Sequence, residues 1–200
     1  MRASDPNVTR RELAAAEAAE DVQKCIEICR GAMTTESNSD PKNLWHFGIK
    51  LAAFLKTRES ASSQDVDEAI AVMEHLLAVV SRQDKPIRWA FLNSQLGAAI
   101  LERNGDLSEA LLHCENALEV LTREKNPEDW ALAKRAAGDA YYRLAQDNDS
   151  ISDLNKALTY YREALTVFTP EKYPDEGLIE TIDLIASVLS EAREERKESL

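Results

Sequence analysis

The chain has 200 residues, of which 44% are hydrophobic and 30% are charged, and it contains only 6 Gly and 6 Pro. This length fits one domain or a short repeat array, and the composition excludes a disordered or loop-rich chain. The formal net charge is -12 and no basic run offsets it, which excludes nucleic acid and anionic membrane surfaces as partners.

The N-terminal residues contain no apolar core of the kind that a signal peptide needs. No stretch of the chain approaches the roughly 20 apolar residues of a membrane-spanning helix. The 3 cysteines are an odd number and match no disulfide framework, which is typical of a reducing compartment. We therefore expect a cytoplasmic protein.

The first expected element follows a flexible segment over residues 1–8 and is one amphipathic leading helix over residues 9–34. Val22, Ile26 and Cys29 share a face of this helix at the spacing of a buried stripe. Cys25 and Cys29 stand at i, i+4, so a redox or metal pair is the alternative to simple packing. The flanking isoleucines favour packing of both cysteines in the core.

Four later segments share an opening that contains a proline, and these prolines recur at intervals of 41 to 47 residues. Proline is well tolerated at the first position of a helix, and Asp40 and Asn126, which precede two of the prolines, are favourable N-caps. Each opening therefore predicts the start of a helix. The four segments are Asp40–Trp45, Lys85–Ala90, Asn126–Ala131 and Tyr173–Leu178.

Each of the first three units is expected to contain a second helix. Asp106 is the expected N-cap of this helix in the second unit, and Ser150 is the expected N-cap in the third. Small residues at one position of the first helices allow the second helix to approach closely; they are Ala52, Gly97 and Gly138. The expected elements are hairpins over residues 41–81, 86–123 and 127–169, a capping helix over 175–195 and a flexible tail over 196–200. Polar loops are expected over 35–40, 58–64 and 146–151.

The third unit resembles the tetratricopeptide repeat (TPR) signature in its run Gly138-x2-Tyr141, Ala157-x3-Tyr161-x2-Ala164 and Pro170. The repeat units of this chain are longer than the standard repeat of about 34 residues. They are similar to the long TPR units of bacterial proteins that often carry a CHAT (caspase-like) peptidase domain. The resemblance implies an all-α, right-handed superhelical solenoid of antiparallel hairpins with about eight helices. It also implies a role in a bacterial regulatory or defence system whose effector is a separate chain or domain.

The resemblance further implies that the first helices of the hairpins line a concave face that binds a partner. The Lys and Asn residues of a chaperone-tail clamp are not matched, since Ile49 and Leu132 are among the residues at those positions. A more apolar groove within an acidic surface favours a basic or amphipathic segment of another protein. The implied groove residues are His46, Ile49, Lys56, Phe91, Ser94, Leu101, Leu132, Arg135, Asp139, Tyr142 and Arg143.

Arg135, Asp139 and Arg143 form an i, i+4 row beside Tyr142. One interpretation is a site that binds a carboxylate and stacks an apolar group, and the other is a self-satisfied row of surface ion pairs. Tyr160 precedes the packed Tyr161 and is expected to face out of the stack.

Motifs of nucleotide-binding loops, metalloproteases and serine hydrolases are absent from the sequence. Adjacent residues on a helix point about 100° apart, so His113 and Cys114 do not form a nucleophile and base. Cys114 takes the buried aromatic position of its repeat, and His75 is expected to be half-buried beside Leu76. We expect no catalysis, no cofactor and no bound metal.

The sequence thus favours a non-catalytic adaptor or scaffold that binds a peptide or helix of a partner protein. The alternative is a structural module that forms a homodimer through its terminal helices. Leu178, Ile182, Ile185 and Leu189 recur at i, i+4, i+7 and i+11 and would be available for that contact if no other helix covered them.

Overall fold

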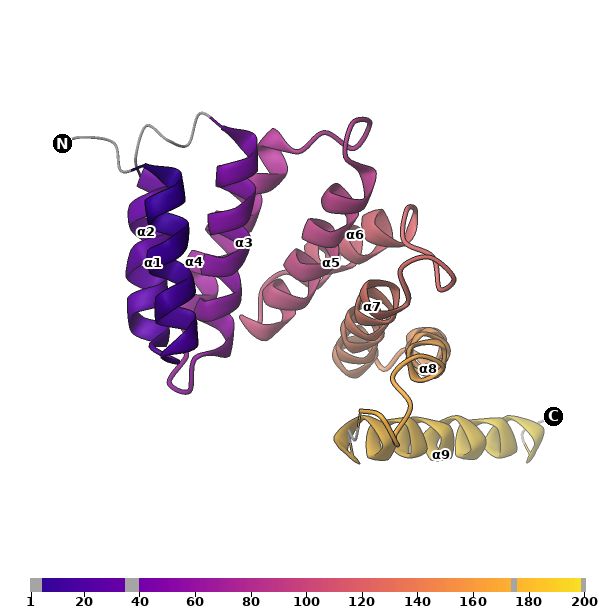
Figure 1. Cartoon of the computed structure of the whole chain (residues 1–200). Helices are drawn as coiled ribbons and strands as arrows, with labels where there is room; N and C mark the ends of the chain where they lie inside the picture. Colours follow the sequence, from indigo (N-terminus) through magenta and orange to yellow (C-terminus); the bar gives the residue numbers. More distant parts are fainter. Residues whose placement is uncertain (1–4, 35–39, 174–175, 199–200) are drawn as a thin grey trace. The chain divides into compact units, whose positions relative to one another are not determined.

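The computed structural model describes residues 5–34, 40–173 and 176–198, and within them it contains nine α-helices and no β-strand (Figure 1). The chain divides into two compact units, Met1–Lys85 and Pro86–Leu200. The expected all-α class is confirmed, and consecutive helices pack against each other within each unit. The right-handed superhelix stays a prediction.

The N-terminal unit consists of two helical hairpins. The first is formed by α1 (Pro6–Ala18) and α2 (Val22–Thr34), and the second by α3 (Pro41–Thr57) and α4 (Ser63–Val79). Successive helices of this unit contact each other: α2 packs against both α1 and α3, and α3 packs against α4.

The C-terminal unit has two hairpins and a last helix. The hairpins are α5 (Pro86–Glu102) with α6 (Leu107–Leu118), and α7 (Pro127–Asn148) with α8 (Ile151–Leu165); the last helix is α9 (Glu176–Glu198). Helix α7 packs against α5, α6 and α8, while α9 packs against α8. No helix among the described residues combines the length and the apolar character needed to cross a membrane.

The prediction of one leading helix over residues 9–34 is wrong, because the chain turns between α1 and α2. Glu20 adopts the left-handed conformation (φ 55°), and the Asp21 amide donates to the Ala16 carbonyl oxygen over 3.0 Å. This pattern closes the C-terminus of α1 as a Schellman motif. The Asp21 carboxylate then accepts from the Lys24 amide and caps α2.

Three of the four expected proline openings start helices, at Pro41, Pro86 and Pro127, while Pro174 of the fourth lies outside the described residues; a further proline opening, at Pro6, was missed. Asp40 accepts from the Lys42 amide at the start of α3, and Asp5 accepts from the Asn7 amide at the start of α1. Helix α1 therefore begins inside the segment expected to be flexible, whose residues 1–4 lie outside the described residues. Asn126 occupies the N-cap position of α7, as expected, but its side chain makes no capping hydrogen bond.

Other boundaries need smaller corrections. Helix α7 continues to Asn148, so the expected loop over 146–151 shrinks to Asp149 and Ser150, and Asp149 is left-handed (φ 50°). Helix α9 continues to Glu198 through most of the expected tail, and residues 199–200 lie outside the described residues. Residues 35–39 of the first loop and 174–175 of the last opening also lie outside them.

Glycines allow close helix packing in the C-terminal unit, as expected. A Cβ atom at Gly138 would lie 2.6 Å from Cδ1 of Tyr161, and one at Gly97 would lie 2.6 Å from Sγ of Cys114. In the N-terminal unit the equivalent close approach is at Gly48 against Leu76, one helical turn before the expected Ala52.

Candidate functional site

The implied groove residues divide between the two units. On α3, in the N-terminal unit, His46, Ile49 and Lys56 are half-buried. The His46 ring lies edge-on to Phe47 with 5.1 Å between ring centroids, and burial lowers the pKa of His46. The surroundings of His46 thus favour the neutral imidazole, which suits packing better than recognition of an anion.

Two implied residues on α5 do not face a groove. Ser94 is fully buried and donates its hydroxyl hydrogen to the Phe91 carbonyl oxygen, and Leu101 is 3% exposed. The prediction that these side chains bind a partner is therefore wrong, because they belong to the core of the hairpin. Phe91 itself is half-buried.

The row on α7 holds helices together. Asp139 accepts a hydrogen bond from the hydroxyl of Tyr161 over 2.8 Å, which links α7 to α8. Arg143 donates to the Leu101 carbonyl oxygen over 2.8 Å and to the Asn104 side chain over 3.1 Å, which links α7 to the end of α5. These bonds engage two members of the row, which weakens the carboxylate-site interpretation. Leu132 and Arg135 are half-buried beside them.

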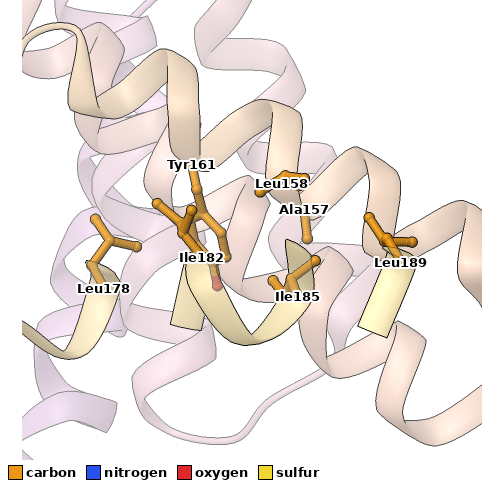
Figure 2. Close-up of a cluster of buried hydrophobic side chains, with 7 residues drawn as sticks. All are labelled: Ala157, Leu158, Tyr161, Leu178, Ile182, Ile185 and Leu189. Carbon is orange, nitrogen blue, oxygen red and sulfur yellow. The ribbon is translucent and has the colours of Figure 1, made fainter. Parts of the chain in front are cut away.

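The four α9 residues expected to mediate self-association are buried within the chain. Figure 2 shows them in a row facing α8, in one cluster with Ala157, Leu158 and Tyr161. They are Leu178, Ile182, Ile185 and Leu189, each at most 8% exposed. The prediction that they mediate self-association fails because α8 covers them.

A pocket of about 310 Å³ lies beside this cluster, and we call it the α7–α9 pocket. Its walls come from the end of α7, the start of α8 and the middle of α9, and they are mostly apolar. The lining residues are Tyr142, Ala145, Gln146, Asp149, Ile151, Leu154, Leu184, Ile185 and Val188. Tyr142 is the one residue of the implied groove that lines it.

The pocket follows from the packing order of the helices. Helix α5 packs against α7, but among the described residues no comparable contact joins α7 to α9, which packs against α8 instead. Tyr142 packs against the α8–α9 cluster from the α7 side. The space beside it stays open because α7 and α9 are held apart by α8.

Large apolar side chains gather at this pocket. Leu184 is 54% exposed, Ile151 44% and Val188 38%. They are three of the seven large hydrophobic residues that are exposed in the described part of the chain; the other four are Val8, Val79, Ile87 and Leu112. Clustered exposed apolar surface marks interaction sites more reliably than scattered residues do. The sequence signal was present, since Leu184 and Val188 form a second i, i+4 stripe on α9.

The charged groups around the pocket are acidic. Asp149 lines it, and Glu180, Asp183 and Glu191 are exposed on α9 close to Leu184 and Val188. None of the nine lining residues is Lys or Arg. The pocket is therefore an apolar hollow with a negative border.

An aromatic row between α7 and α8 was also missed, and it is structural. The ring of Tyr160 stacks on Tyr141 at 5.5 Å, and Lys134 Nζ lies 4.5 Å from the Tyr160 centroid and 2.7 Å from Glu163. Tyr160 therefore does not face freely out of the stack. Cation–π contacts of this kind fix neighbouring helices.

The histidines and cysteines have structural surroundings. Nδ1 of His113 lies 2.8 Å from Oδ1 of the buried Asn93, which joins α6 to α5. Cys25, Cys29 and Cys114 are buried and free, and burial raises the pKa of Cys114 to about 12. His75 is exposed on α4 rather than half-buried.

Within the described residues, no three His, Cys, Asp or Glu side chains are placed together to hold a metal ion. Helical hairpins that stack through contacts between consecutive helices define an all-α helical-repeat architecture. No protein-family model matches the chain, and no curated protein matches it either.

Proposed function

We propose that this chain is a non-catalytic interaction module of the TPR-like helical-repeat class, which holds a helix or peptide of a partner protein. The α7–α9 pocket carries this proposal, because three exposed large apolar side chains meet there at a hollow of about 310 Å³. Exposed apolar surface costs free energy in water, and covering it with a partner recovers about 25 cal/mol per Å² before the costs of association.

The proposal moves the binding site relative to the groove that the resemblance implies. Tyr142 remains part of the site, whereas Ser94, Leu101 and Arg143 act within the fold. A role as the recognition arm of a bacterial regulatory or defence system, in the cytoplasm, belongs to the same proposal and rests on the resemblance alone.

The test uses a lysate of the cells in which the protein naturally occurs. It compares the proteins that the wild-type chain and two variants capture from this lysate. Leu184→Ser with Val188→Ser changes the pocket, whereas Leu112→Ser changes a comparably exposed leucine on α6 that lies outside it. All three side chains are exposed, so both variants should keep the fold, which circular dichroism checks.

We expect a partner that wild type and Leu112→Ser retain equally and that the pocket variant loses. A partner retained by all three proteins would place binding elsewhere on the chain. Capture of nothing by the wild-type chain would contradict the proposed function itself.

A further inference from the structure

We propose that the occupant of the α7–α9 pocket is an amphipathic helix that carries Lys or Arg beside its apolar stripe. The inference rests on the proposed function and specifies the chemistry of the partner. Three observations lead to it: the size of the pocket, the spacing of its apolar side chains and the sign of the charges around it.

The size of the pocket sets what can enter it. A hollow of about 310 Å³ is at the lower limit for a drug-sized ligand, and its walls offer few polar groups to orient a small molecule. Apolar side chains that project from a protein segment match it better. Ile151, Leu154 and Val188, from two different helices, would contact such side chains from two sides.

The spacing of the apolar residues favours a helix as the segment. Leu184 and Val188 stand at i, i+4 on α9 and are both exposed, so they form a short ridge of the kind that packs into the groove of another helix. An extended strand would need an exposed sheet edge, and the described residues contain no strand.

The charges around the pocket determine which residues are favoured beside the apolar stripe of the partner helix. Glu180 and Glu191 lie one turn to either side of the ridge on α9, and Asp183 is adjacent to Leu184. Asp149 lines the pocket from the end of α7. The cation next to Tyr142 on α7, Arg143, is engaged by the end of α5. Lys or Arg flanks would therefore meet carboxylates, and acidic flanks would meet like charge.

The same charges oppose a second copy of this chain as the occupant. Pairing of α9 with α9 of another copy through Leu184 and Val188 would bring the carboxylates of Glu180, Asp183 and Glu191 close to the carboxylates of the other copy. Like charges placed opposite each other destabilise such a contact. A basic helix of a different protein avoids this repulsion.

The probes are three synthetic peptides of about 18 residues, a length chosen because helices shorter than about 12–15 residues are marginal in water. The first has Leu at i, i+3, i+4 and i+7 with Lys on both flanks. The second has the same leucines with Glu in place of Lys, and the third is a scrambled version of the first. Calorimetry gives their affinities for the full chain.

We expect the Lys peptide to bind at least about tenfold more tightly than either of the other peptides. Its affinity should fall at least about tenfold for Leu184→Ser with Val188→Ser and stay unchanged for Leu112→Ser. The variant Asp149→Lys with Asp183→Lys should remove most of the preference for Lys over Glu, because it replaces two border carboxylates with cations.

The inference would be overturned if the Lys and Glu peptides bound with equal affinity. It would also be overturned if the affinity of the Lys peptide were the same for the wild-type chain and for the pocket variant. A wild-type dimer that Leu184→Ser with Val188→Ser dissociates would overturn it too, because the occupant would then be a second copy. If a captured partner depends on the pocket while the peptides show no charge preference, the proposed function stands and only the basic helix fails. If no captured partner depends on the pocket, the proposed function fails as well.

Discussion

In the N-terminal unit, ion pairs between half-exposed charged side chains connect the first hairpin to the second, whereas in the C-terminal unit buried groups connect α7 to α8 within the last hairpin. Arg30 of α2 pairs with Glu68 of α4, with Nε to Oε1 at 2.6 Å, and their side chains are 43% and 32% exposed. Lys50 of α3 pairs with Glu17 of α1 in the same manner. Such pairs contribute about 0–1 kcal/mol each and weaken in salt.

In the C-terminal unit, helices α7 and α8 are connected by buried contacts. The ring of Tyr161 lies on Gly138 with no room for a Cβ atom, and its hydroxyl reaches Asp139. Buried contacts of this kind depend on shape, so small changes in volume are costly. A half-exposed ion pair contributes little, so substitutions at the buried α7–α8 contact should cost more stability than substitutions in the ion pairs of the N-terminal unit.

Among the variants that test this comparison, Gly138→Ala is expected to have the largest effect on stability. The new Cβ atom would meet Cδ1 and Cε1 of Tyr161 at 2.6 and 2.7 Å, and a buried ring cannot move away freely. We expect a loss of about 1–3 kcal/mol of unfolding free energy, measured by amide hydrogen exchange in α7 and α8.

Two glycines of the N-terminal unit are the controls. A Cβ atom at Gly31 would have nothing within 4 Å, so Gly31→Ala should stabilise α2 by up to about 1 kcal/mol. At Gly48 a Cβ atom would lie 3.0 Å from both δ carbons of Leu76, which is fully buried, so Gly48→Ala should cost less stability than Gly138→Ala but should not stabilise the unit as Gly31→Ala does. Equal changes at Gly138 and Gly31 would show that the packing at Gly138 is not close.

The next effect is expected for Tyr161→Phe, which keeps the ring and removes the hydrogen bond to Asp139. We expect a loss of about 0.5–1.5 kcal/mol, the usual net worth of such a bond. Burial raises the pKa of Tyr161, so the hydroxyl remains a donor throughout the neutral range. Asp139→Asn is the companion change, and a double-mutant cycle with Tyr161→Phe separates the coupling between these two groups from the other contacts of Asp139.

A pH effect is expected in the N-terminal unit. Hydrogen bonds from Ser62, and then the Arg58 guanidinium, hold the pKa of Asp65 below its ordinary value. Because the folded pKa is lowered, the stability from this group is present above the unfolded pKa of about 3.9 and is lost as the pH falls through the folded pKa.

The protection of the α4 amides against hydrogen exchange should therefore fall as the pH drops below about 4, and Asp65→Asn should remove that dependence while costing stability at neutral pH. Glu74→Gln, at an exposed position of the same helix, is the control. The assignment would be contradicted if α4 lost the same protection in acid when position 65 carries the Asp65→Asn change.

The elements were largely predictable from the sequence because they depend on local signals. The pairs Asp40-Pro41 and Asn126-Pro127 mark helix starts correctly, and Asp5-Pro6 carries the same signal at the start of α1. The turn after α1 was hidden because Glu20, rather than a glycine, takes the left-handed position. The chemistry of single residues did not reveal it.

The site was much less predictable, because exposure depends on which helix covers which face. Ile185 and Leu184 are adjacent and equally apolar, yet α8 buries the first and leaves the second exposed. Similarly, the sequence indicates that Arg143 is a surface cation, whereas in the structure its guanidinium donates a hydrogen bond to the carbonyl oxygen of Leu101. Periodicity identifies an apolar stripe, and only the packing of non-adjacent helices decides whether it is core or surface.

The smallest expected effect is that of the Lys50–Glu17 pair, and it would test the N-terminal side of the comparison. A double-mutant cycle with Glu17→Gln and Lys50→Gln should give a coupling of about 0.2–1 kcal/mol at low salt, and the coupling should diminish at high salt because both side chains are partly exposed. The readout is amide exchange in α1 and α3, the helices that the pair joins. Arg143→Gln, whose partner is a backbone carbonyl in the C-terminal unit, should cost more and respond less to salt, since a carbonyl carries no net charge to be screened. A salt-independent coupling between Lys50 and Glu17 would mean that water does not reach the pair, and the contrast between the two units would then lie in glycine packing alone.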